Sequence, residues 1–322
     1  MRRRTMFSLS CAAVLAVAMP GVAQAQRVAR IGLLGGQGGP LWKAFTDELK
    51  QVGWEEGRNL IIDVRFRPDD PQKYRAQAEE LVAAQVELIV ASSDPAVAAA
   101  YKATQSIPIV MLGSGPVERG YAKSLANPGG NVTGVAYQSL DFTGKEFSLL
   151  KEMRPDLKKI GIPITLGSNP LSDAWFKRWQ SAGSSQAVTV VPLPDVRRMT
   201  EVEPMLAAAR REGVQALVVG PKYFLLGAGW QRIEAWAIEN KVLTNSGTWT
   251  HGEAVLAYGF NSLEVIRIAV RKIDRILRGA KPAGLPIEQP TRFELIVNEK
   301  LAKAIGLTVP QSVLLQATEV IR

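Results

Sequence analysis

Short apolar runs alternate along the chain with longer segments in which apolar residues recur every three or four positions. Runs such as VELIV at residues 86–90 are typical of buried strands, whereas EVEPMLAAARREG at residues 201–213 has the period of an amphipathic helix. Strands that alternate with helices of about 10–15 residues favour parallel sheets flanked by helices. The pattern therefore predicts an α/β fold.

The predicted elements follow one another from residue 27 to the C-terminal region. We expect a helix to start near Asp70 and Pro71, which suit its cap and first turn. The predicted strands cover residues 27–34, 59–66, 86–92, 107–112, 131–137, 158–164, 187–193, 214–220 and 242–247, with a last one from 293. The predicted helices cover residues 40–53, 70–84, 95–104, 141–153, 169–186, 201–213, 229–241 and 262–279, with a last one ending near 306.

About nine strand–helix steps make a large single sheet, and NPGGNVTG at residues 127–134 offers a place for one sheet to end. We therefore expect two doubly wound parallel-sheet lobes joined by crossing strands. The first would contain residues 26–138 and about 259–285, and the second residues 139–258 and about 286–322. KPAGLPIEQP contains three prolines, which favours an extended connection and another crossing between the lobes.

The first 25 residues form a separate segment with the composition of a signal peptide. Three arginines follow Met1, residues 6–19 are nearly all apolar, and Ala23-Gln24-Ala25 places small residues at both cleavage positions. This order predicts export with cleavage after Ala25. Cys11 lies within the apolar stretch, so the mature chain would contain no cysteine and could form no disulfide, thiol nucleophile or cysteine metal site.

The charge balance gives little support to a nucleic-acid partner. The formal net charge is +9, and removal of the three signal arginines lowers it to +6. The basic residues are scattered rather than gathered into a track with aromatic residues, so we expect no nucleic-acid binding. No segment after the signal is long and apolar enough to span a membrane.

Few residues of the mature chain are suited to catalysis. His251 is its one histidine, and HExxH, GxSxG and paired DxD motifs are absent. The loop LLGGQGGPLW lacks the Lys-Ser/Thr pair of a P-loop, and Leu41 stands where a GxGxxG frame needs glycine. We expect no metal, no cofactor and no catalytic residue. An exported α/β enzyme that uses Asp94 and His251 remains the alternative.

The loops that follow the predicted strands are small, polar and rich in glycine. Ligands of open α/β sheets bind at the carboxyl ends of the strands, and free N–H groups at helix starts there attract anions. Aromatic residues in neighbouring loops, Trp42, Tyr137, Tyr223 and Trp249, are suited to cover an apolar part of a ligand. The predicted ligand contacts are Gly35, Ser92, Ser93, Asp94 and Ser114 in one lobe and Asn169, Tyr223, Gly247 and Thr248 in the other.

Several longer stretches together resemble a known family. They are FTDELKQVGWEEGRNLIIDVRF (45–66), VELIVASSDPAVAAAYKATQSIPIVML (86–112), SLANPGGNVTGVAY (124–137), TGKEFSLLKEM (143–153) and the tail at 276–321. With them the chain resembles exported substrate-binding proteins of ABC transporters of the TrpX-like type. The resemblance implies the type I periplasmic-binding-protein fold, a periplasmic location, and delivery of a small molecule to a permease in the inner membrane. We expect a monomer.

The resemblance also implies a ligand position. Some family members hold an aromatic amino acid by its carboxylate at the helix start that corresponds to Pro95, which places Ser93, Asp94 and Ala96 on that turn and Tyr137 near the cleft. Family members commonly have Thr or Ser where this chain has Asp94. Asp94 would cap its helix, pair with a ligand amine, or face an uncharged part of the ligand. An amino acid or a related compound is the expected ligand class, and a sensory binding protein is a further alternative.

Overall fold

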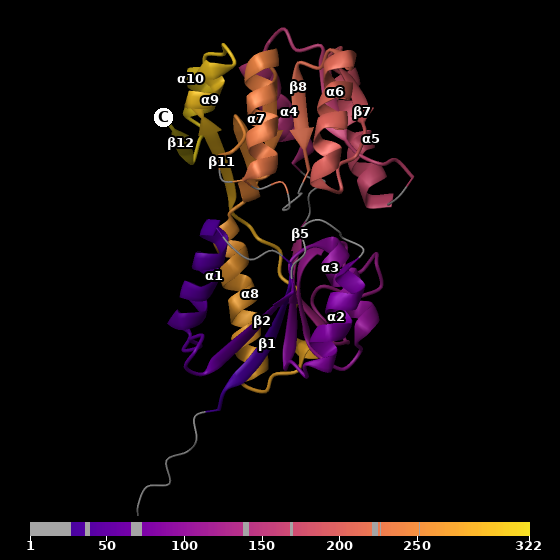
Figure 1. Cartoon of the computed structure of the whole chain (residues 1–322), viewed down its shortest axis with the longest axis vertical. Helices are drawn as coiled ribbons and strands as arrows, with labels where there is room; N and C mark the ends of the chain where they lie inside the picture. Colours follow the sequence, from indigo (N-terminus) through magenta and orange to yellow (C-terminus); the bar gives the residue numbers. More distant parts are fainter. Residues whose placement is uncertain are drawn as a thin grey trace, which may run out of the picture.

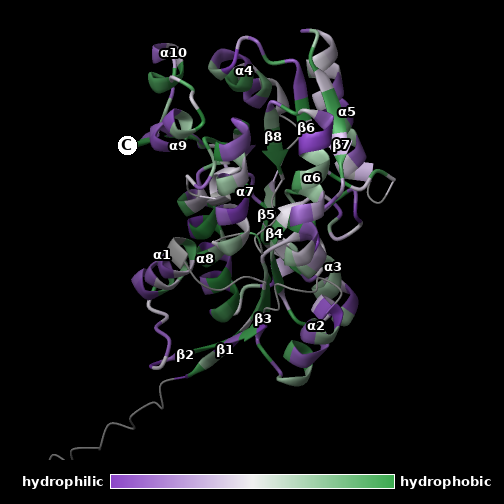
Figure 2. Ribbon diagram, turned by 45° about the horizontal axis from the view of Figure 1, so that its top comes forward, coloured by the Kyte–Doolittle hydropathy of each residue, from purple (hydrophilic) through white to green (hydrophobic). Residues whose placement is uncertain are grey.

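The computed structural model describes residues 27–35, 39–65, 73–137, 142–167, 170–220, 225, 227–250 and 252–322. Two α/β lobes stand one above the other, each built on a central sheet with helices on both faces (Figure 1). The apolar strands run through the interior of the lobes, while the helices carry polar outer faces (Figure 2). The two-lobed α/β fold predicted from the apolar pattern is thus the observed one.

The first lobe contains a fully parallel sheet with the strand order β2-β1-β3-β4-β5. Successive strand residues face opposite sides, so Leu88 and its register partner Ile31 pack in the core under α1 and α8, whereas Ile89 packs in the core under α2 and α3. The strands are β1 (Ala29–Leu34), β2 (Leu60–Arg65), β3 (Leu88–Ala91), β4 (Ile109–Ser114) and β5 (Val132–Tyr137). The helices are α1 (Gly39–Gln51), α2 (Tyr74–Ala83), α3 (Asp94–Ala103) and α8 (Ser262–Leu277).

The second lobe has the strand order β12-β11-β10-β9-β8-β6-β7. Its part β7-β6-β8-β9-β10 repeats the order of the first sheet, which is the doubly wound arrangement. The strands are β6 (Lys159–Pro163), β7 (Thr189–Leu193), β8 (Ala216–Val219), β9 (Leu243–Ser246), β10 (Leu256–Phe260), β11 (Phe293–Asn298) and β12 (Glu319–Ile321). The helices are α4 (Thr143–Met153), α5 (Pro170–Ser184), α6 (Val202–Glu212), α7 (Ala228–Asn240), α9 (Glu299–Ala304) and α10 (Gln311–Leu314), with 3₁₀ turns η3 (Met199–Glu201), η5 (Thr248–Thr250) and, in the first lobe, η6 (Pro282–Gly284).

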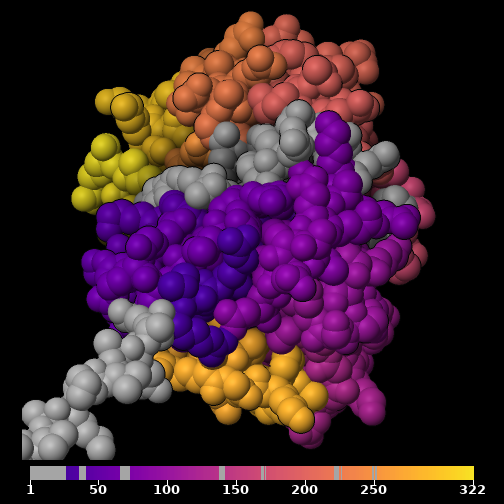
Figure 3. All heavy atoms as spheres, turned by 60° about the horizontal axis from the view of Figure 1, so that its bottom comes forward, coloured from indigo at the N-terminus to yellow at the C-terminus, as the bar shows by residue number. Residues whose placement is uncertain are grey.

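The chain passes between the lobes three times. It leaves the first lobe after β5, returns after β10 to form α8, and crosses again between η6 and β11. Helix α8 therefore lies beside α1 although about two hundred residues separate them in the sequence (Figure 1). In Figure 3, orange atoms from the later part of the chain accordingly border the indigo and purple atoms of the first lobe. Because the last crossing re-enters from the side where β10 ends, β11 runs antiparallel to β10. Antiparallel pairing in the second sheet was not expected from the sequence.

The last crossing is tied to the first lobe at Glu288. Its backbone pairs beside β5, with the Ala136 N–H donating to its carbonyl at 2.9 Å and its own N–H donating to the Gly134 carbonyl at 3.0 Å. Its carboxylate forms an ion pair with Lys272 of α8, whose side chain is 3% exposed. Glu288 thus belongs to the sheet of the first lobe, three residues beyond the predicted change at residue 285, and the predicted lobe boundaries stay a prediction.

Some elements differ from those predicted. Strand β10 was not predicted, and neither were the C-terminal elements α10 and β12. The proline-rich segment, expected to be extended throughout, contains the turn η6. The predicted cap at Asp70 and Pro71 lies outside the described residues. None of the helices within the described residues has the length and apolar character needed to cross a membrane.

Candidate functional site

The carboxyl ends of the two sheets face each other across the crossings. The chain enters β1 from the far end of the first lobe, and β8 points toward that lobe from above (Figure 1). In doubly wound sheets, ligands bind where the strand order reverses, which is between β1 and β3 in one lobe and between β6 and β8 in the other. The fold therefore turns two such switch points toward each other.

Gly35 and Ser92 form the switch point of the first lobe. Gly35 follows β1 with a φ of 137°, and a Cβ atom added there would lie 1.8 Å from the Ser92 Oγ. The Ser92 N–H in turn donates to the Leu34 carbonyl at 3.1 Å. Only glycine permits this backbone conformation together with this close approach.

Ser93, and not Asp94, caps helix α3. Ser93 has extended backbone angles, and its hydroxyl accepts from the Ala96 N–H at 3.4 Å. Asp94 is already the first helical residue, so the interpretation of Asp94 as the cap is wrong. The hydroxyl of Ser93 also hydrogen-bonds Tyr74, whose pKa is raised by burial. The side chain of Ala96 is fully buried.

The carboxylate of Asp94 reaches across to the loop after β4. Its Oδ1 accepts from the Ser114 N–H at 2.7 Å, and its Oδ2 accepts from the Ser114 hydroxyl at 2.5 Å and from Arg119 Nη2 at 3.1 Å. A Cβ on Gly113 would lie 2.7 Å from Oδ1, so glycine there leaves room for the carboxylate. Arg119 was not predicted as a site residue, although the GSGPVERG loop that contains it follows a predicted strand.

Aromatic residues from all three crossings pack together. Tyr137, which lies opposite Ser114 in the register of β4 and β5, stacks on Phe260 with the ring centres 5.9 Å apart. Phe142 contacts Phe260 at 4.6 Å and Phe293 at 5.2 Å, both edge to face. These contacts join the ends of β5 and β10 to the starts of α4 and β11. A rotation of one lobe against the other about the crossings would therefore pivot at this aromatic cluster.

In the second lobe, the side chains after β9 are engaged with the protein itself. The hydroxyl of Thr248 is buried and donates to the Phe260 carbonyl at 2.6 Å. The hydroxyls of Ser246 and Thr250 lie 2.6 Å apart, so one donates to the other, and the second donates to the half-buried Gly247 carbonyl, which lies 3.1 Å from both. The predicted contacts Asn169 and Tyr223, the side chain of Trp249, and His251 lie outside the described part of the chain.

A buried carboxyl lies beside this strand end. Glu146 of α4 is 8% exposed, and its Oε1 accepts from Asn245 Nδ2 at 3.0 Å. Burial raises the pKa of Glu146 to about 7, although the Asn245 hydrogen bond lowers it. The Oδ1 of Asn245 and the Oγ1 of Thr143 are buried and have no hydrogen-bond partner among the residues that the structure describes. The pKa of Tyr258 is raised as well, first by burial and then by the charge of Glu146. No sequence pattern marked this cluster.

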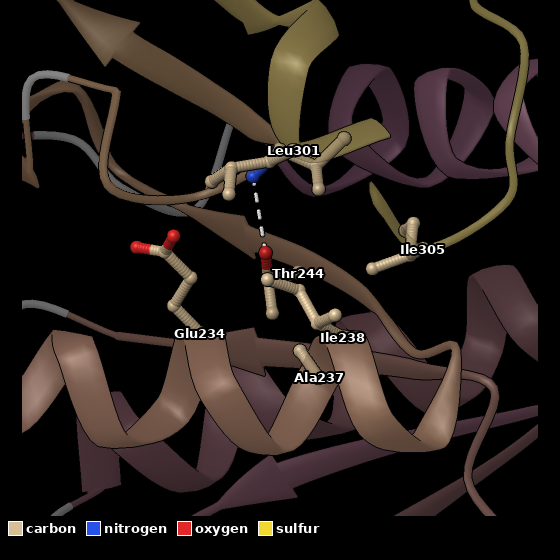
Figure 4. Close-up of a pocket in the computed structure, with 7 residues that line it drawn as sticks. Glu234, Ala237, Ile238, Thr244, Leu301 and Ile305 are labelled. Atoms are coloured by element: carbon tan, nitrogen blue, oxygen red, sulfur yellow. Dashed lines mark hydrogen bonds between the residues drawn. The ribbon is translucent and has the colours of Figure 1, made fainter. Parts of the chain in front are cut away.

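Two pockets lie at the opposite, amino ends of the second-lobe strands. One has a volume of about 10 Å³ between α7, β9 and α9, where the Val255 N–H donates to Thr244 Oγ1 at 3.0 Å (Figure 4). That volume holds about one water molecule. The other, of about 490 Å³, lies along α5 and the edge strand β7. Neither pocket lies where the sheets face each other. Within the described ranges, no group of three or more His, Cys, Asp or Glu residues is placed to hold a metal ion.

The facing sheet ends are chemically suited to holding a small polar solute. The structure brings together six of the predicted residues at the carboxyl end of the first sheet, namely Gly35, Ser92, Ser93, Asp94, Ser114 and Tyr137. Gly247 and Thr248 lie at the carboxyl end of the second sheet. Asp94 is already engaged by Ser114 and Arg119. A catalytic pairing of Asp94 with His251 stays untested, since His251 lies outside the described residues.

Known proteins match this fold and most of this sequence. The ABC transporter substrate binding protein family matches residues 41–321. A tyrosine-binding protein of Clostridioides difficile (strain R20291) is 40% identical over 270 residues, which are 82% of this chain and 76% of that protein. An ABC domain from Streptococcus pneumonia in complex with L-Trp covers 91% of this chain and 100% of its own, at a TM-score of 0.79 and 24% identity.

A further solved structure has the same coverage. It is a conserved domain protein from Vibrio cholerae, with a TM-score of 0.80 and 22% identity over 91% of this chain and 100% of that chain. A ligand-free, open substrate-binding protein with adhesive properties from Clostridium difficile reaches 0.59 at 25% identity, over 91% and 99%. These matches confirm the family and the fold that the sequence predicted. The chain belongs to the family of ABC transporter substrate-binding proteins.

Proposed function

We propose that this protein captures an amino acid or a related small compound between its two lobes and presents it to an ABC permease. The observation that carries the proposal is the facing of the two switch points, with Gly35 and Ser92 at that of the first lobe. A ligand that touches both lobes favours the closed arrangement, so binding and closure are coupled. The similarity to a tyrosine-binding protein and to a complex with L-Trp makes aromatic amino acids the first candidates.

The proposed ligand contacts are those expected from the sequence. The first lobe would contribute Gly35, Ser92, Ser93, Asp94, Ala96, Ser114 and Tyr137, and the second Asn169, Tyr223, Gly247 and Thr248. Binding at such a site needs no bond-breaking group, metal or cofactor. The protein would act without catalysis, as a monomer, after export to the periplasm and cleavage of the signal peptide behind Ala25.

A thermal-shift screen of the mature protein tests the proposal. The panel contains the amino acids, simple carboxylates and purines, and each hit is followed by calorimetric titration. A ligand at 100 times its dissociation constant adds about 2.7 kcal/mol to the free energy of unfolding. A saturable hit among the amino acids is expected, and a panel with no hit contradicts the proposal. Turnover of a bound compound that is lost in a His251→Ala variant would favour the enzyme instead.

A further inference from the structure

In the corner formed by Asp94, Ser114 and Arg119, the hydrogen-bond acceptors are occupied while some of the donors are not. A carboxylate accepts hydrogen bonds but donates none. Both oxygens of Asp94 are occupied, Oδ1 by the Ser114 N–H and Oδ2 by the Ser114 hydroxyl and Arg119. The carboxylate is also only 33% exposed. Asp94 therefore offers a ligand amine little that is not already used.

Arg119, in contrast to Asp94, has hydrogen-bonding groups that are not used. A guanidinium has five N–H donors and no acceptor. Within the described residues, the structure gives this group one acceptor, Asp94 Oδ2, and Arg119 Nε is buried without a partner. The side chain is 21% exposed and lies on the loop that follows β4, at the facing end of the sheet. The unused capacity of the corner consists of charged donors, which suit an anion.

The start of α3 is itself poorly equipped to take that anion. Pro95 has no N–H, and the N–H of Ala96 is taken by Ser93. The negative charge of Asp94 in the first turn offsets the positive end of the helix dipole. An anionic group at this corner is accordingly better served by Arg119 than by the helix.

We propose that Arg119 is the residue of the first lobe that recognises a carboxylate of the ligand, and that Asp94 positions Arg119 in place of the direct ligand contact expected from the sequence. The inference rests on the proposed function and names the ligand class more closely, as a solute with a carboxylate held by a guanidinium. Arginine binds carboxylates through two parallel hydrogen bonds in a fixed geometry, which its ammonium counterpart lysine does not reproduce. Asp94 gives the guanidinium one fixed acceptor and leaves its remaining donors for the ligand.

Acid and amide pairs of the same ligand test this directly. Calorimetry compares L-tyrosine with L-tyrosinamide, and every other acid bound in the screen with its amide, on the wild type and on Arg119→Met. The variant should lose about 10- to 100-fold in affinity for the acid, as expected for charge-assisted hydrogen bonds, and less than about 3-fold for the amide. The affinity of Arg119→Lys for the acid should lie between that of the wild type and that of Arg119→Met. Arg75→Met is the matched control, because Arg75 pairs with Glu79 on an exposed face of α2.

The role of Asp94 is tested in both backgrounds. Asp94→Asn should weaken acid binding several-fold when Arg119 is present, because the guanidinium loses its fixed acceptor, and should not weaken it in the Arg119→Met background. A purely structural role would lower the affinities for acid and amide alike in both. Either that result or an equal loss caused by direct contact of Asp94 with the ligand amine would show that Asp94 does not act through Arg119, and would overturn the inference.

The two proposals fail in different ways. If the wild type binds no acid of the panel, the proposed function fails and the inference with it. If the wild type binds an acid but Arg119→Met loses acid and amide affinity equally, or loses neither, the inference fails while the proposed function stands. Circular dichroism and melting curves of each variant exclude unfolding as the cause of a lost affinity.

Discussion

Replacing Glu146 with glutamine should make the protein more stable above pH 7. Burial holds the pKa of Glu146 at about 7, against 4.5 for an ordinary glutamate. The folded state therefore binds the proton more tightly than the unfolded state does. The contribution of Glu146 to stability is full below pH 4.5, falls as the pH rises from 4.5 to 7, and is constant above, when the carboxylate is charged in both states.

The size of the effect follows from the shift. A difference of roughly 2.5 pKa units at about 1.4 kcal/mol per unit amounts to about 3 kcal/mol at pH 8. Glu146 is 8% exposed, so solvent screening reduces this little. A glutamine keeps the acceptor for Asn245 Nδ2 and adds a donor near the unpartnered Asn245 Oδ1. The variant should gain up to about 3 kcal/mol at pH 8 and almost nothing at pH 4.5.

Chemical denaturation of the mature protein across pH 4.5 to 8.5 measures this, with the two lobes followed separately if they unfold in two steps. Glu203→Gln is the control, because Glu203 is exposed on α6. The wild type and the control should lose stability between pH 4.5 and 7, and Glu146→Gln should show a flatter profile. Parallel profiles for the wild type and Glu146→Gln would refute the assignment of a buried, nearly neutral carboxyl.

Three further substitutions test individual features, each by urea denaturation. Gly35→Ala should cost more than about 1 kcal/mol, because the new Cβ meets Ser92 at a positive φ; an unchanged midpoint would contradict the close approach. Glu288→Gln should cost about 2 kcal/mol by leaving the buried ammonium of Lys272 without its charge partner, somewhat less than for a fully buried pair because Glu288 is 38% exposed. Ser93→Ala should cost about 1 kcal/mol as the loss of a helix cap, and a neutral result would argue against that cap.

The fold was largely predictable because its signal is local. Strands such as β3 are short apolar runs, and helices such as α8 carry apolar residues at helical spacing. Strand β10 was not predicted because it is only five residues long and contains Gly259, where a side chain would crowd Thr248. Its partner β11 lies more than thirty residues away and antiparallel, and such pairing leaves no trace in a local pattern.

The candidate site was predictable as a set of strand-end loops but not in its contacts. Ser93 and Asp94 are both good cap residues, and the sequence does not say which of two neighbours takes the position. The structure gives the cap to Ser93 and turns Asp94 toward Arg119, 25 residues further along the chain. Glu146 carries no sequence signal because its environment is made by Asn245, 99 residues away.

Small-angle scattering of the mature protein, before and after saturation with the tightest ligand of the screen, tests most directly whether the ligand binds between the lobes. Closure about the crossings brings the two sheet ends together, so the radius of gyration should fall, and the fall should follow the same isotherm as calorimetric binding at one ligand per chain. Saturable binding with an unchanged radius of gyration would contradict a ligand site that closes between the lobes.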